Sequence, residues 1–215
     1  MYRQILKLGL ICFVAAGLNT DVISQNMTSG RVALGVFVPR GEDADVSKTS
    51  LVLQMTGDVQ LQGRFGVEAE VSWTPINLDT SKLPAGQINE ARQITAVGGL
   101  RLASTNLSIV DSKPSAYISA RIGLSRIAVR SDAASSVSGW IGGAVDAAKN
   151  PPQFIFPVRA TENAFVISPR AGFLIRSSGK ALVDVSITPS FLFDGGVVTT
   201  QVFATIGFGL IGSLD

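Results

Sequence analysis

Apolar and polar residues alternate with a period of two along most of the chain after residue 30. Alternation of this kind is typical of β-strands that present one face to an apolar environment. The segment 65–73 is the clearest example, because every odd-numbered position is apolar and every even-numbered position is small or polar. We predict eight such strands, at 31–38, 51–61, 65–73, 92–103, 115–129, 164–176, 181–191 and 198–210.

The predicted connections fall into two classes of length. Short turns are expected at 62–64 and 177–179. Longer polar loops are expected at 39–49, 77–90 and 131–162. Short turns at one end and long loops at the other are typical of an up-and-down barrel in an outer membrane. Two connections fit this pattern less well: 104–114 is long for the turn end, and Asp194 and Gly195 predict a two-residue hairpin at the loop end.

Two prolines lie on predicted strands. Pro169 and Pro189 have no backbone N–H to donate, and a closed barrel has no edge strand on which to place them. We therefore expect both prolines at bulges or strand ends near the rim.

The N-terminal segment has the order of a secretory signal peptide. Arg3 and Lys7 precede an apolar run at 8–18, which is followed by a polar stretch. The apolar run is too short to cross a bilayer as a helix. We predict a signal peptide at 1–24 and a mature barrel domain at 25–215; a buried N-terminal helix is the alternative.

The amino-acid composition limits the kinds of catalysis, metal binding and partner that this chain can have. Apolar residues make up 46% of the chain and charged residues 16%, whereas about 25% charged residues is usual for a soluble protein. The absence of histidine excludes imidazole acid–base catalysis and imidazole metal ligation. A formal net charge of +2 indicates no nucleic-acid partner. We expect no catalytic residue, no cofactor and no metal site.

The predicted signal peptide, eight alternating segments of ~10 residues and a terminal strand containing Phe208 and Leu210 together resemble small bacterial outer-membrane barrels of the OmpX/OmpA/OmpW type. The resemblance implies an all-β fold, an eight-stranded antiparallel up-and-down transmembrane β-barrel. It also implies location in the bacterial outer membrane after secretion and cleavage of the signal peptide. The implied partners of this monomer are outer-membrane lipid, lipopolysaccharide and the barrel-assembly machinery.

Strand parity predicts two outward-facing aromatic girdles, which are typical of such barrels at the two membrane interfaces. The residues concerned are Phe65, Phe173 and Phe208 at the turn ends, and Trp73, Phe165 and Phe191 at the loop ends.

The same parity directs charged residues into the lumen. Pairing Leu61 with Phe65 across the turn places Asp58 opposite Glu68, with Glu70 two residues further on. These carboxylates would repel one another unless basic groups lie nearby. The charged residues expected in the lumen are Asp58, Glu68, Glu70, Asp184, Arg31, Arg101, Arg121 and Arg170. We expect a structural network of ion pairs; a proton or cation site is the alternative.

The longest predicted loop, 131–162, carries apolar residues outside the alternating pattern: Trp140, Ile141, Phe154 and Phe156. They are candidate contacts for lipopolysaccharide, a host surface or a partner barrel. A lid or an extension of the strands is the alternative.

The sequence thus predicts a non-enzymatic outer-membrane barrel with a structural or surface-interaction role. A barrel that transports or binds a small hydrophobic compound is the main alternative. A soluble barrel of lipocalin type is a third possibility, and it would require an apolar interior and a polar exterior.

Overall fold

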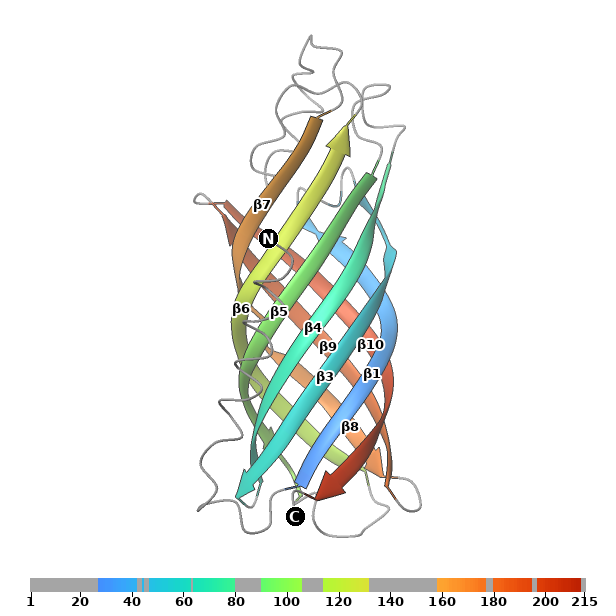
Figure 1. Ribbon diagram of the computed structural model, residues 1–215, viewed down its shortest axis with the longest axis vertical. Helices are drawn as coiled ribbons and strands as arrows, with labels where there is room; N and C mark the ends of the chain where they lie inside the picture. Colours follow the sequence, from blue (N-terminus) through green and yellow to red (C-terminus); the bar gives the residue numbers. More distant parts are fainter. Residues whose placement is uncertain are drawn as a thin grey trace.

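A single antiparallel β-sheet closes into a barrel in the computed structural model (Figure 1). The structure describes residues 27–41, 44, 47–62, 64–79, 90–105, 114–131, 158–176, 180–194 and 197–213. Within these ranges there is no helix with the length and apolar character needed to cross a membrane.

The strands are β1 (Met27–Arg40), β2 (Ser47–Lys48), β3 (Ser50–Gln62), β4 (Phe65–Leu78), β5 (Glu90–Ala103), β6 (Ser115–Ser131), β7 (Val158–Ile167), β8 (Arg170–Arg176), β9 (Ala181–Asp194) and β10 (Val197–Ser213). Strands β7 and β8 occupy one position in the wall, between β6 and β9, and β2 adds a short pairing to β4. The wall therefore has eight positions, and β1 closes the ring by pairing with β10 from Met27–Ser213 to Arg40–Thr200. The predicted fold class is confirmed.

The two ends of the barrel differ. We call the end where β3 meets β4 the turn end, and the end where β6 stops and β7 starts the loop end. Most strands extend past their predicted limits toward the loop end, because inward-facing residues such as Thr74 and Ile76 continue the alternation in β4. Strand β7 starts inside the predicted loop 131–162.

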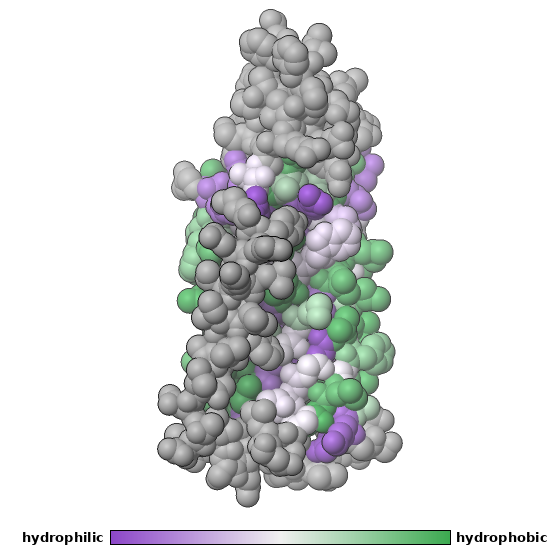
Figure 2. Space-filling view, in the orientation of Figure 1, coloured by the Kyte–Doolittle hydropathy of each residue, from purple (hydrophilic) through white to green (hydrophobic). Residues whose placement is uncertain are grey.

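Large apolar side chains are exposed along the outward face, and green, hydrophobic residues lie at both flanks of the barrel in Figure 2. Leu51, Leu210 and Phe208 are 71%, 67% and 64% exposed, while the even-numbered residues of β4 from Gly66 to Ile76 are buried. A lipocalin-type barrel requires a polar exterior around an apolar interior. These residues do not form that distribution.

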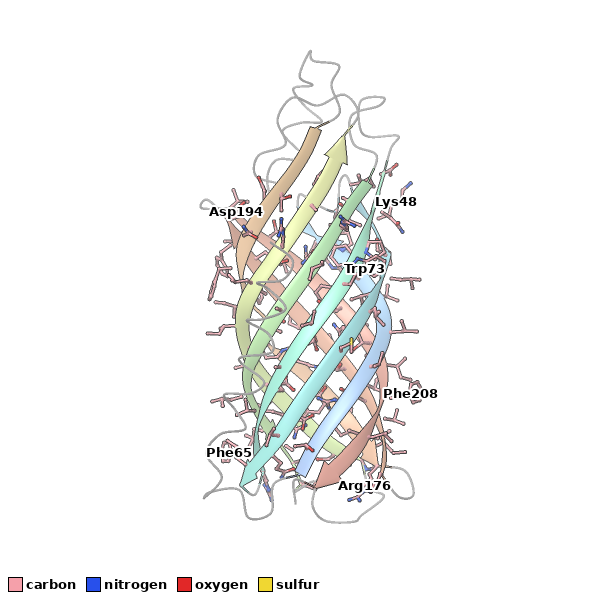
Figure 3. All side chains as sticks on the ribbon, viewed as in Figure 1. Lys48, Phe65, Trp73, Arg176, Asp194 and Phe208 are labelled. Atoms are coloured by element: carbon pink, nitrogen blue, oxygen red, sulfur yellow. The ribbon has the colours of Figure 1, made fainter. Side chains whose placement is uncertain are left out.

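Aromatic side chains mark both ends of this apolar surface. Phe65 and Phe208 lie toward the turn end and Trp73 lies toward the loop end (Figure 3). Phe173 and Phe165 are also exposed. Phe191, predicted to face outward, is only partly exposed. Its neighbour Phe193 is 38% exposed and packs against Phe165, with 6.2 Å between ring centroids.

The two prolines meet at one interruption in the wall, formed by residues 168–170 and 188–190. Pairing between β7 and β9 ends at Ile167–Phe191, and pairing between β8 and β9 resumes at Ala171–Ile187. Pro169 lies between the ends of β7 and β8, so it is at a strand end as expected, but in the interior of the wall and not near the rim. The expectation for Pro189 is wrong: it lies inside β9 and pairs with Val202, without a bulge. Because the two prolines face the same gap, the two missing backbone N–H donors produce one interruption of the hydrogen-bond ladder and not two.

Two turn predictions need correction. Leu61 does not pair with Phe65; a bulge leaves Gln62 opposite Phe65, although Asp58 does lie opposite Glu68. At the loop end β9 continues to Asp194 and β10 begins at Val197. The connecting pair is therefore 195–196, one position later than predicted.

Candidate functional site

Inward-facing positions on seven strands bring eight charged side chains into the lumen. Each residue is at most 6% exposed. They are the four arginines Arg31, Arg101, Arg121 and Arg170, and the four carboxylates Asp58, Glu68, Glu70 and Asp184. Among the described residues, the buried positive and negative charges are therefore equal in number. Such balance matters because an unpaired charge in a low-dielectric interior is costly.

Six of these side chains form a closed ring of alternating charge across the lumen. Going round the ring, the nitrogen–oxygen distances are 3.8 Å for Arg31–Glu68, 3.6 Å for Glu68–Arg121, 2.9 Å for Arg121–Glu70, 2.8 Å for Glu70–Arg170, 2.9 Å for Arg170–Asp184 and 3.3 Å for Asp184–Arg31. The members come from β1, β4, β6, β8 and β9, so this charge ring connects opposite parts of the wall.

Asp58 and Arg101 are attached to the charge ring through Arg31. Arg31 Nη2 and Arg101 Nη2 each lie 2.9 Å from an oxygen of Asp58, one on Oδ2 and the other on Oδ1. The Ser29 hydroxyl donates a 2.6 Å hydrogen bond to Asp58 Oδ2. Asp58 is thus surrounded by donors, which offsets its repulsion from the opposed Glu68.

Neutral side chains hold the carboxylates in place. Ser119 donates to Glu68 at 2.7 Å, Thr56 donates to Glu70 at 3.1 Å, and Tyr117 donates to Asp184 at 2.8 Å. These three residues were not predicted from the sequence, although their inward parity next to charged positions was a usable signal. The Arg170 guanidinium also lies 5.7 Å from the centroid of the Tyr117 ring.

Arg121 links the charge ring to the interruption in the wall. Its Nε donates to the Ser168 carbonyl at 3.1 Å, and its Nη2 donates to Ser168 Oγ at 3.1 Å. Ser168 Oγ and Ser190 Oγ are 2.8 Å apart, so one hydroxyl donates to the other across the gap. Side-chain hydrogen bonds therefore connect β9 to Ser168, between β7 and β8, where the backbone ladder is interrupted.

Apolar side chains lie on both sides of the charged layer. Toward the turn end, Tyr117 packs with four aliphatic residues, Ala103, Leu174, Leu182 and Ile211. Toward the loop end, Phe37, Val52 and Phe203 form a second buried cluster. Also near the loop end, Gln93 donates across the lumen to Gln201 at 3.1 Å.

This arrangement is suited to cross-linking strands. Each of the four buried carboxylates lies within 3.6 Å of an arginine nitrogen. In the part of the chain that the structure describes, no group of three acidic side chains is placed to hold a metal ion. The predicted signal peptide at 1–24 and the loop residues Trp140, Ile141, Phe154 and Phe156 lie outside the described residues.

No protein-family model and no curated protein matches this sequence. Solved structures do match it. Neisserial surface protein A is 9% identical with a TM-score of 0.54, and the match covers 86% of this chain and 96% of that one. The outer membrane protein OprG from Pseudomonas aeruginosa is 10% identical with a TM-score of 0.50, covering 89% and 97%. At these identities the likeness concerns the fold alone: this chain has the fold of small outer-membrane β-barrels.

Proposed function

We propose that this chain is a bacterial outer-membrane β-barrel protein with a structural or surface-interaction role, and that it acts as a monomer. The observation that carries the proposal is the apolar outward face of a closed ring of strands. Met55, Leu100 and Ile118 are 61%, 65% and 60% exposed, on three different strands. A contiguous apolar surface of this kind is unfavourable in water and is matched by the hydrocarbon of a bilayer.

Ring closure supports the same conclusion. Hydrocarbon offers no hydrogen-bond partner, so a sheet within it must have no free edge. The pairing of β1 with β10 removes both edges. The two aromatic levels, with Phe65 and Phe208 at one end and Trp73 at the other, fit the interfaces of a membrane.

The filled lumen favours a structural role over a broad water-filled pore. An eight-stranded barrel is just wide enough for its own side chains. The charge ring and the apolar clusters on either side of it fill that space and connect the strands to one another. The proposal accordingly assigns no catalytic residue and no cofactor.

The test is fractionation combined with gel mobility. We expect the expressed protein to sediment with outer-membrane markers and to run at different positions on an SDS gel before and after boiling. Recovery in the soluble fraction, or identical mobility after refolding into detergent, would contradict the proposal.

A second candidate is a barrel that binds or transports a small hydrophobic compound. It is favoured by the apolar cluster of Phe37, Val52 and Phe203 near the loop end, and by the interrupted wall at 168–170 and 188–190. Native mass spectrometry of protein extracted from cells would test it. A retained apolar small molecule that is lost in Phe203→Gln supports this candidate, and an empty barrel opposes it.

A further inference from the structure

The outward face changes from apolar to basic abruptly near the loop end. A row of paired residues across β4, β5, β6 and β7 is wholly apolar: Val71, Ala96, Leu124 and Phe165. The next row toward the loop end is Trp73, Ile94, Arg126 and Asn163, and the row after that is Pro75, Arg92, Ala128 and Thr161. Two arginines therefore occupy the first rows beyond the apolar surface.

Both arginines point out of the barrel. Arg92 lies between Ala91 and Gln93, which are 3% and 2% exposed, and Arg92 itself is exposed. Arg126 lies between Ser125 and Ile127, each 1% exposed. Since successive side chains of a strand alternate between faces, neither guanidinium is directed into the lumen.

The two arginines are close neighbours. Arg92 pairs with Ala128, so Arg126 is two residues away along the same face of β6. Residues at diagonal positions of this kind are about 7–8 Å apart, with their Cβ atoms somewhat closer, and long side chains easily bridge this distance. Among the side chains that the structure describes, no carboxylate forms an ion pair with Arg92 or Arg126. Two guanidinium groups, neither of them ion-paired with a side chain that the structure describes, thus share one small area, which we call the rim pair.

We propose that the rim pair binds a phosphate group of lipopolysaccharide in the outer leaflet. This inference rests on the proposed outer-membrane location, which places the loop end at the outer face. A guanidinium fork matches the oxygens of a phosphate, and two forks can hold one phosphate from both sides. Trp73, in the same row as Arg126, sets the depth at which headgroups meet hydrocarbon.

Other lipids fit this location less well. A zwitterionic headgroup carries its own cation and gains less from two arginines. A singly charged phospholipid is the chemical competitor, but the outer leaflet of an outer membrane is built mainly from phosphorylated glycolipid. The acyl chains of such a lipid would lie along the apolar row of Val71, Ala96, Leu124 and Phe165.

The test uses refolded protein in a neutral detergent, with binding measured by native mass spectrometry. The probes are diphosphorylated lipid A, phosphatidylglycerol and phosphatidylcholine. The variants are Arg92→Gln with Arg126→Gln, the two single substitutions, and Arg40→Gln as a control. Arg40 is exposed at the loop end of β1, away from β5 and β6. Each protein is first checked for heat-dependent gel mobility.

We expect the affinity of the double variant for lipid A to fall by at least about tenfold, because two charge-assisted interactions are lost. Arg40→Gln should bind like the unmodified protein, and the single variants should weaken binding in the same direction. Equal affinity in the double variant, an equal loss in Arg40→Gln, or equally tight arginine-dependent binding of phosphatidylglycerol would each overturn the proposal. A protein that fails the gel test instead contradicts the proposed membrane role, so the two failures are distinguishable.

Discussion

Asp58 on β3 and Glu68 on β4 lie directly opposite each other in the lumen, and Arg31 from β1 contacts both. Its Nη2 atom is 2.9 Å from Asp58 Oδ2 and 3.8 Å from Glu68 Oε2. Opposed like charges destabilise a strand pair, but here a third strand supplies the compensating charge. The two opposed carboxylates of β3 and β4 thus provide contacts that link both strands to β1.

The first prediction compares two members of the charge ring. Asp184 has Arg170 at 2.9 Å, Arg31 at 3.3 Å and the Tyr117 hydroxyl at 2.8 Å, whereas the arginines around Glu68 are at 3.6 and 3.8 Å. Asp184→Asn should lower the free energy of unfolding by about 3 kcal/mol, because removing one partner leaves buried charges uncompensated. Glu68→Gln should cost less. Urea unfolding in lipid vesicles measures both values, and an equal or reversed order would refute the ranking.

The second prediction concerns coupling between Arg101 and Asp58. Arg101→Gln and Asp58→Asn should each destabilise the barrel, and the double variant should cost at least about 1 kcal/mol less than the sum. The pair of Lys48 and Asp79, 3.1 Å apart with side chains 60% and 17% exposed, provides the control. Its coupling should stay below about 1 kcal/mol, because solvent screens surface pairs. Additive effects at the buried pair would show that the 2.9 Å contact contributes nothing.

The third prediction tests which face meets lipid. Ala69 lies midway between Phe65 and Trp73 on the outward face of β4, opposite Gly57 and Gly98, so an arginine there meets no steric conflict. Ala69→Arg should cost roughly 2–4 kcal/mol in vesicles, as for an arginine at the bilayer midplane. Asn77→Arg, on the same face near the loop end, should cost about 1 kcal/mol or less. Equal costs would place Ala69 outside the hydrocarbon.

The fourth prediction concerns the interrupted wall. Ser168→Ala with Ser190→Ala removes the hydroxyl pair that bridges the gap, so backbone amides of Ala171 and Phe191 should exchange hydrogen faster. The matched control is Thr95→Ala with Ser125→Ala, a hydroxyl pair 2.9 Å apart on strands whose ladder is continuous. Exchange near this control pair should not change. Equal protection in both double variants would mean that the Ser168–Ser190 bond does not hold the wall together.

The alternation of side chains along each strand made the inward and outward positions predictable from the sequence. Outward-facing Phe65 and inward-facing Glu68 follow from an alternation that needs no partner strand. The opposition of Asp58 and Glu68 also follows, because a short turn limits the possible registers.

Other features depend on the stagger of distant strands, which no local pattern encodes. Arg101 reaches Asp58, which is two strands away in the ring, and this requires the shear of the whole barrel. Pro189 can lie inside β9 only because Ser168 and Pro169 happen to face it. The bulge at Leu61 is likewise set by how the β3–β4 turn closes.

Closure of β1 on β10 is the central claim, and cross-linking tests it most directly. Val36 and Ala204 are paired across this closing ladder, and residues 25–215 contain no cysteine. We would introduce Val36→Cys with Ala204→Cys, and treat vesicle-embedded protein with a short thiol-reactive cross-linker. Met55→Cys with Val71→Cys, paired within the β3–β4 hairpin, is the control. A closed barrel predicts that both pairs cross-link with similar yield; cross-linking of the hairpin pair alone would mean that the sheet is open.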